Sequence, residues 1–200
     1  MTAEAEVDAS AVLDFWFGAA VDDGIGARAP PRPEWFRKDT AFDAVVAKRF
    51  GATLEAALAG RLAAWAGTPA GALALIVVLD QFTRKAFRDT PRAFAGDAQA
   101  LALARALVAE GHDRGMSPLQ RWFAYMPFEH AEDIGLQHES LRLFGSLAAE
   151  HPHTQQALDY AVKHRDVVAR FGRYPHRNAV LGRESTATEL AFLSQPGASF

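Results

Sequence analysis

Apolar residues recur at helical spacing along most of this 200-residue chain, and no segment alternates polar and apolar residues as a strand would. Between Thr40 and Trp65, apolar side chains return every three or four positions. Residues 70–85 are apolar on every side until Asp80, which is typical of a buried helix. These patterns predict an all-α fold of antiparallel helix pairs, arranged as a tetratricopeptide-like array or an irregular bundle.

Start and stop signals mark the expected helix ends. Thr68-Pro69 is the clearest start, with Thr as the cap and Pro at the first helical position. We expect one domain over residues 1–200, with residues 1–9 flexible and the Gly- and Pro-rich residues 18–33 forming a long loop. The other expected helices are 11–17, capped by Ser10 and closed by Gly18; 40–65, with Gly51 as a point of division; 98–110, capped by Asp97; a short helix from Ser117 to about Tyr125; 127–150; 154–171, capped by Thr154 and closed by Gly172; and a last helix opened by a capping box of Thr186 and Glu189.

Composition limits the functions open to this chain. It has no cysteine, which excludes disulfides, thiolate chemistry and cysteine-based metal sites. Its net charge of −3 argues against a nucleic-acid binder, which usually carries a basic excess. The longest apolar run, residues 70–79, has ten residues and is too short to span a bilayer. The acidic N-terminus also lacks the features of a secretory signal. We therefore expect a cytoplasmic protein without nucleic-acid or membrane partners.

The clearest functional clue follows Pro127, which is expected to open the longest helix. Helical geometry places four polar residues on the side that later turns of this helix give to Phe and Leu. Polar groups on a buried stripe must be paired or must face a cavity. One explanation is a carboxylate and an imidazole that act as a general acid–base pair. The other explanation is a structural network, because acidic side chains near a helix N-terminus interact favourably with the helix dipole. The four residues are Glu129, His130, Asp133 and Gln137.

A second histidine, His164, lies in the middle of the apolar arc of the helix at 154–171. A lone histidine there is either a core residue or a further acid–base group. Only residues 151–153 separate this helix from the one expected to start at Pro127, so the two should pack antiparallel. That pairing would bring the basic loop that follows residue 172 near the acid–base stripe.

Two helices are followed by arginines at the same spacing, F-x-R-x-x-x-R, at residues 82–88 and 171–177. Guanidinium groups hold carboxylates and phosphates by paired hydrogen bonds, so these loops could bind an anion. The other explanation is that the arginines stabilise helix C-termini and pair with Glu129, Glu132 and Asp133.

These patterns give two sets of candidate residues. Metal binding by His130, Asp133, His164 and His176 has no supporting ligand spacing, so no metal and no cofactor are assigned. The candidate catalytic residues are Glu129, His130, Asp133, His164 and His176. The candidate ligand-binding residues are Arg84, Arg88, Gln137, Arg173, Arg177, Asn178 and Arg183.

Recognisable motifs lie along nearly the whole chain: VLDFWFG at 12–18, WF at 35–36, LDQFTR at 79–84, TPRAFA at 90–95, YMPFEHAED at 125–133, RFGRYPHRN at 170–178 and LGREST at 181–186. Together these motifs resemble the bacterial domain-of-unknown-function 924 family. The resemblance implies an all-α, tetratricopeptide-like fold and no established activity. The family's usual Gln-Phe-Pro-Arg-Asn appears here as residues 81–85, Gln-Phe-Thr-Arg-Lys, so a role for that Asn does not carry over. The chain also lacks the W-x-x-L-G-x-x-Y signature of true tetratricopeptide repeats.

Two functions fit these observations. The first is a polar pocket for a small anionic ligand, with general acid–base catalysis left as an open question. The alternative is a helical-repeat module that binds a peptide or a partner protein, in which the charged residues form a structural ion-pair network.

Overall fold

The computed structural model describes residues 7–18 and 31–198, and all regular structure in these ranges is helical. The all-α prediction is confirmed, whereas the tetratricopeptide-like arrangement stays a prediction. No helix in the described ranges has the length and apolar character needed to cross a bilayer. The helices are α1 Ala9–Phe17, α2 Pro33–Phe36, α3 Thr40–Leu58, α4 Pro69–Ile76, α5 Thr83–Ala86, α6 Asp97–Ala109, α7 Pro118–Glu129, α8 Ile134–Glu150, α9 Gln155–Phe171 and α10 Ala187–Leu193, with a π-helical segment, Val77–Phe82, between α4 and α5.

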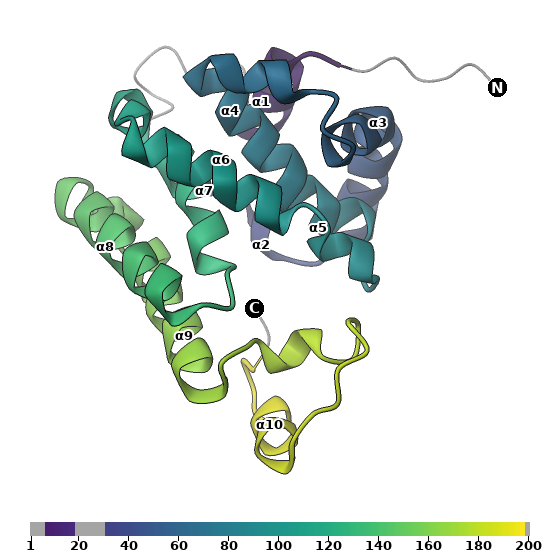
Figure 1. The fold of residues 1–200 in the computed structure, drawn as a ribbon, viewed down its shortest axis with the longest axis vertical. Coiled ribbons are helices and arrows are strands. Elements are labelled where there is room, and N and C mark those ends of the chain that lie inside the picture. Colours follow the sequence, from purple (N-terminus) through teal and green to yellow (C-terminus); the bar gives the residue numbers. More distant parts are fainter. Residues whose placement is uncertain (1–6, 19–30, 199–200) are drawn as a thin grey trace.

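The helices form a larger N-terminal part, from α1 to α6, and a hairpin of α8 and α9 that α7 joins to it (Figure 1). α8 and α9 pack antiparallel, as the short connection between them predicts. The chain then turns back beneath α7, and a short turn at 175–177 precedes α10. The expected flexible segment 1–9 and the loop 18–33 fall mostly outside the described residues, although Ala9 already begins α1 and Pro33 begins α2.

Aromatic side chains fill the core between α1, α2, α3 and α7. Trp16 stacks on Trp35 with ring centroids 5.6 Å apart, and Trp35 meets the edge of Phe123 at 4.9 Å. Phe50 and Phe82 lie 4.6 Å apart on the other side of the same cluster. Such pairs bury large apolar areas and favour tilted or edge-on geometry. The core therefore fixes α2 and α7 on the N-terminal part, and both helices contribute to the pocket described below.

The prediction that one helix runs from Pro127 to Glu150 is wrong about where that helix begins. α7 continues through Pro127 and ends at Glu129, and α8 begins only after Asp133. Proline lacks one backbone N–H, and near the end of a helix that loss affects a single hydrogen bond. The stronger local signal is Asp133, whose carboxylate accepts the Leu136 N–H at 2.9 Å and caps α8. The polar residues on either side of this corner therefore lie on two helices and not on one stripe.

Several caps differ from the predictions, while others agree. Thr68 caps α4 as predicted, accepting from the Gly71 N–H at 3.1 Å, and the capping box of α10 is present. Asp8, and not Ser10, caps α1. Asp97 is the first residue of α6 and pairs with an arginine instead of capping the helix. α3 runs through Gly51 but ends at Leu58, before the predicted end at residue 65. The Thr154 hydroxyl donates to the His151 carbonyl and does not cap α9. A π-helical segment interrupts the helix expected over 70–85.

Candidate functional site

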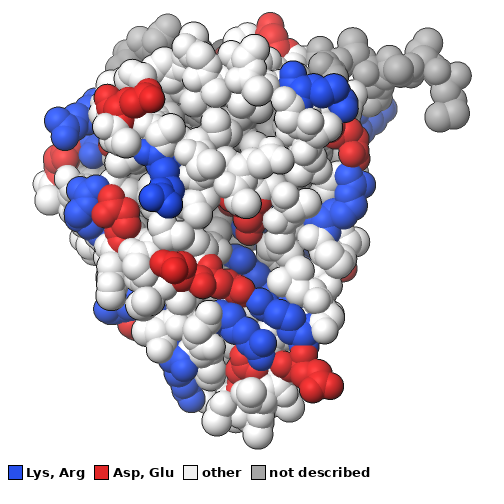
Figure 2. All heavy atoms as spheres, in the orientation of Figure 1, with Lys and Arg blue, Asp and Glu red and all other residues white. Residues whose placement is uncertain are grey.

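A pocket of about 500 Å³ lies where α2, α5, α7, α9 and the turn at 175–177 meet. One part of its lining is aromatic or apolar and the other is charged. In Figure 2, charged side chains of both signs gather on the lower half of the visible face, where the C-terminal segment lies. The apolar lining comes from Trp35, Phe36, Phe94, Trp122, Met126 and Tyr160. The cationic lining comes from Arg37, Lys38, Arg84, Lys85, Arg88 and Arg177.

The π-helical segment supplies a fully buried carboxylate, Asp80, beside this pocket. Its Oδ1 lies 2.7 Å from Nδ1 of His130 and 3.1 Å from Nη1 of Arg84. Its Oδ2 accepts from the Gln81 amide at 2.6 Å. A π-helical turn shifts the following side chains out of α-helical register and is frequent at functional sites. Both carboxylate oxygens are therefore paired, as burial of a charge requires.

The charges around Asp80 decide the protonation of its histidine partner. Burial raises the pKa of the Asp80 carboxyl, but Arg84 and His130 outweigh it, so the net pKa lies well below the ordinary value. Burial lowers the pKa of His130, and the attraction of Asp80 offsets this only in part because Arg84 adds to the lowering. Asp80 is therefore charged and His130 neutral at pH 7. With Nδ1 donating to Asp80, the Nε2 of His130 is the ring nitrogen left to accept a proton.

A second carboxylate–imidazole pair, Glu129 and His164, lines the same pocket. Nδ1 of His164 lies 2.9 Å from Oε1 of Glu129 and 2.9 Å from the Tyr160 carbonyl oxygen. Both neighbours accept hydrogen bonds, so Nδ1 carries the hydrogen. The backbone of Glu129 is braced in turn, because its carbonyl oxygen accepts from the hydroxyl of Tyr174 and from the amide of Gln137.

Two arginines share one carboxylate at the charged end of the pocket. Arg84 makes paired hydrogen bonds to Asp97, at 2.9 and 3.0 Å. Arg177 lies 3.6 Å from the same carboxylate, and its buried Nε has no hydrogen-bond partner among the described residues. Its guanidinium lies over the rings of Phe94 and Tyr174, 4.8 and 4.5 Å from their centroids. Arg177 is thus only 7% exposed, stacked between aromatic rings, and incompletely paired.

Lys85 and Arg88 extend the cationic lining towards α2. The Nζ of Lys85 donates to the carbonyl oxygens of Glu34 and Trp35, at 2.8 and 3.0 Å. Burial, with Arg88 nearby, lowers the pKa of Lys85 to about 8. Arg88 makes a paired contact with Asp43, at 2.6 and 3.0 Å. Lys85 therefore holds α2 in place and keeps a positive charge on the pocket wall at neutral pH.

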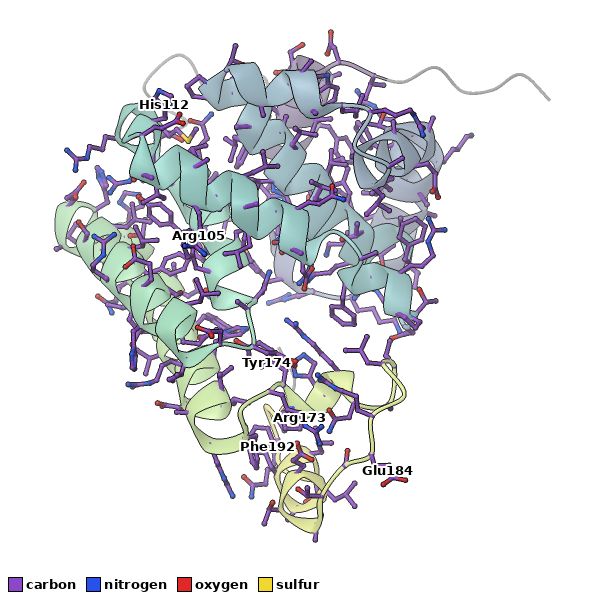
Figure 3. The ribbon with its side chains drawn as sticks, viewed as in Figure 1. Arg105, His112, Arg173, Tyr174, Glu184 and Phe192 are labelled. Atoms are coloured by element: carbon purple, nitrogen blue, oxygen red, sulfur yellow. The ribbon has the colours of Figure 1, made fainter. Side chains whose placement is uncertain are left out.

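The structure brings some of the predicted site residues together and separates others. Figure 3 shows Tyr174 between the C-terminal segment and the end of α7, and Arg173 on the side of that segment towards α10. The predicted residues that line the pocket are Glu129, His130, His164, His176, Arg84, Arg88 and Arg177. The predicted residues with other roles are Asp133, which caps α8; Gln137, which binds backbone carbonyls; Arg173, which pairs with Glu189; Asn178, which donates to Ser185; and Arg183, which pairs with Glu132.

Other residues of the site were missed by the sequence-based reasoning. The i, i+4 spacing of Asp80 and Arg84 predicts an ion pair, which the structure confirms at 3.1 Å, but Asp80 was not among the predicted site residues. Nothing in the nearby sequence indicates that Asp97 is a shared counter-ion, or that Trp35 and Trp122 form an aromatic wall. The partners of these residues are far away in the sequence. Among the residues that the structure describes, no three His, Asp or Glu side chains are grouped so as to hold a metal ion.

Comparisons with known proteins give a match to a family model and a similar solved structure. Residues 12–197 match the model of a family described as bacterial protein of unknown function, DUF924. A solved structure of a protein of unknown function from Agrobacterium tumefaciens, ATU0120, is 38% identical. It superposes with a TM-score of 0.79, and the match covers 93% of this chain and 96% of that one. No curated protein is significantly similar to the chain.

Proposed function

This chain belongs to the DUF924 family of bacterial proteins of unknown function, and we propose that it binds a small organic anion in the pocket between α2, α5, α7 and α9. The observation that carries the proposal is the state of Arg177. This arginine is buried on the pocket wall, and within the part of the chain that the structure describes its Nε has no hydrogen-bond partner. The carboxylate of Asp97, which lies 3.6 Å away, is shared with Arg84. Burial, and next the charge of Arg84, lower its pKa to about 10, so the guanidinium is charged at neutral pH. A buried cation in this state gains from an added anion.

The lining also suggests the body of the ligand. Small-molecule pockets of roughly 300–1,000 Å³ bind through apolar walls and a few polar groups that fix orientation. Here Trp35, Phe36 and Trp122 offer flat apolar surface, and the arginines lie at the other end of the wall. Phe36 is 46% exposed, which leaves apolar area for a ligand to cover. A flat organic molecule with one carboxylate or phosphate would place its apolar body on the aromatic part of the wall and its charge beside the arginines.

The Asp80–His130 pair gives the pocket a group that can transfer protons. Asp80 fixes the tautomer of His130, and the imidazole is neutral at pH 7 with Nε2 as the basic nitrogen. A general base works best when it is unprotonated at the operating pH and within hydrogen-bond reach of its substrate. We therefore include acid–base chemistry on the bound anion in the proposed function.

The test measures binding of small anions by isothermal calorimetry and thermal shift. The panel contains benzoate, phenylacetate, phenyl phosphate, benzylphosphonate and inorganic phosphate. The Arg177→Met variant keeps a long apolar chain between the aromatic rings but removes the charge. We expect it to weaken binding of an aromatic anion about 10- to 100-fold, since a hydrogen bond to a charged group contributes ~1.5–3 kcal/mol.

The matched control is Arg105→Met, which removes an exposed arginine on α6 outside the pocket. It should leave the affinity unchanged. Equal affinity in the wild type and the Arg177→Met variant, or no binding of any panel anion, would refute the proposed function.

A further inference from the structure

Two histidines from different helices line one wall of the pocket, and each is held by its own carboxylate. His130 lies at the end of α7 against Asp80, and His164 lies on α9 against Glu129. Their ring centroids are 6.2 Å apart. In both rings it is Nδ1 that contacts the carboxylate, so the two imidazoles are fixed in the same way. At this separation both rings can reach one bound group.

We propose that these two histidines hydrolyse a phosphate ester of a small organic molecule, with His130 as the general base and His164 as the general acid. The inference rests on the proposed function, because the pocket must first bind the anionic ester. It adds the reaction, the nucleophile, which is water, and the class of substrate.

The step needs no co-reactant other than water. Nε2 of His130 takes a proton from a water molecule as the water oxygen forms a bond to phosphorus. The bond between phosphorus and the ester oxygen breaks, and that oxygen receives a proton from Nε2 of His164. A monoester gives one alcohol and one inorganic phosphate. Proton exchange with solvent then returns both rings to the state in which they began the step.

The surroundings of each ring support these roles. The neutral ring of His130 is suited to accept a proton, because burial and Arg84 disfavour its charged form at rest. The Nδ1 of His164 has two oxygen acceptors, Glu129 Oε1 and the Tyr160 carbonyl, and both contacts are kept when the ring is protonated. Phosphoryl transfer depends mostly on positioning and on charge stabilisation. Arg84, Lys85 and Arg177 supply positive charge on the same wall.

The experiment compares two esters that differ in their need for an acid. p-Nitrophenyl phosphate has a good leaving group, whereas 2-phenylethyl phosphate has a poor one that must be protonated as it leaves. The rate of hydrolysis is measured as the rate at which inorganic phosphate is released. The variants are His130→Asn, His164→Asn and the double variant, which serves as the control for contaminating phosphatases. Circular dichroism and binding of benzylphosphonate, which cannot be hydrolysed, establish that each variant is folded and keeps its pocket.

We expect His130→Asn to lower the rate about 100-fold or more on both esters, since each needs the base. We expect His164→Asn to lower the rate by a similar factor on 2-phenylethyl phosphate and much less on p-nitrophenyl phosphate. Equal losses on both esters would overturn the assignment of His164 as the acid. A wild-type rate no higher than that of the double variant, with benzylphosphonate bound, would overturn hydrolysis and leave the proposed binding intact. Failure to bind benzylphosphonate or any other panel anion would remove both.

A further variant tests whether Glu129 positions His164 and stabilises its charge. Glu129→Gln keeps an oxygen that can accept from Nδ1 but removes the negative charge. We expect a larger fall in rate on 2-phenylethyl phosphate than on p-nitrophenyl phosphate, with both rates compared at saturating ester. A purely structural role of Glu129 would change the rates on both esters by the same factor, and that result would overturn this role.

Discussion

Gly96 lies directly against the backbone of Leu79, so that a β-carbon at position 96 would stand 2.2 Å from the Leu79 carbonyl oxygen. Leu79 belongs to the π-helical segment and precedes Asp80, the buried carboxylate of the site. The neighbouring atoms are backbone, which cannot move aside as a flexible side chain could. The absence of a side chain at position 96 thus permits the close approach of the turn before α6 to the segment that carries Asp80.

The Gly96→Ala variant should therefore be destabilised by about 2 kcal/mol or more, because overpacking against backbone forces the two segments apart. Gly51→Ala is the matched control: Gly51 lies inside α3, and no atom of residues 7–18 or 31–198 would lie within 4 Å of an added β-carbon, apart from the helix itself and its chain neighbours. That variant should gain about 0.5–1 kcal/mol from the higher helix propensity of alanine. Urea denaturation measures both. A Gly96→Ala variant as stable as the wild type would contradict this account of the contact.

Asp80→Asn removes a charge that Arg84 and His130 share in a fully buried position. Removing one partner of a buried ion pair costs about 3–5 kcal/mol, because the other charge stays buried and loses its partner. Asp43→Asn removes the partner of Arg88 at a more exposed site, where a loss of ~1 kcal/mol is expected. Free energies of unfolding from denaturant titrations compare the two. Similar losses of unfolding free energy in the two variants would show that Asp97 alone is enough to balance the charge of Arg84.

Tyr174→Phe deletes a buried hydroxyl that donates to the Glu129 carbonyl oxygen and accepts from Gln137. We expect a loss of about 1–2 kcal/mol, because the Gln137 amide and the carbonyl lose a shared partner. Tyr160→Phe is the control, since the Tyr160 side chain is 39% exposed and the change should fall within ~0.5 kcal/mol. Thermal unfolding at constant pH checks both. Equal effects would mean that the Tyr174 hydroxyl does not brace the end of α7.

Stability should fall between about pH 7 and pH 5 because of His176. Burial, followed by the charges of Arg177 and His164, lowers the pKa of His176 to about 3. The unfolded chain, with an ordinary histidine pKa near ~6.5, binds the proton more readily in this range, so stability rises with pH. The contribution is complete above about pH 6.5 and is lost progressively as the pH falls towards 3.

The comparison uses His176→Gln, which should abolish about 1–2 kcal/mol of this pH dependence. His138→Gln, at an exposed position on α8, controls for the removal of an imidazole. Free energies of unfolding at the two pH values give the result. An unchanged slope in His176→Gln would show that the His176 ring protonates as easily in the folded protein as in the unfolded chain.

Helix ends set by a local side-chain cap could be predicted from the sequence. Thr68 and the Thr186–Glu189 box act within a few residues of the chain, so the pattern contains the whole interaction. Pro127 misled the prediction because proline favours a first helical turn but is also tolerated near the end of a helix already formed. The signal that decided the boundary was Asp133, which was interpreted as part of an acid–base stripe.

The contacts of the candidate site were only partly predictable. The antiparallel pairing of α8 and α9 follows from their short connection, and it brings His164 to Glu129. The contact between His130 and Asp80 joins residues 50 positions apart, and no periodic pattern encodes it. The π-helical segment also escapes helical periodicity, because it shifts the register within an apolar stretch that shows no polar face.

Asp97 gives the pocket an internal competitor for any ligand. Its carboxylate already lies beside Arg177 while it holds Arg84 by two hydrogen bonds. An anion that binds Arg177 thus partly replaces the attraction between Arg177 and Asp97, so binding exchanges one counter-ion for another. The measured affinity is then a difference between two similar interactions. Asp97→Asn should accordingly tighten binding of benzylphosphonate even as it weakens the fold around Arg84, so the same carboxylate would limit affinity and maintain the site.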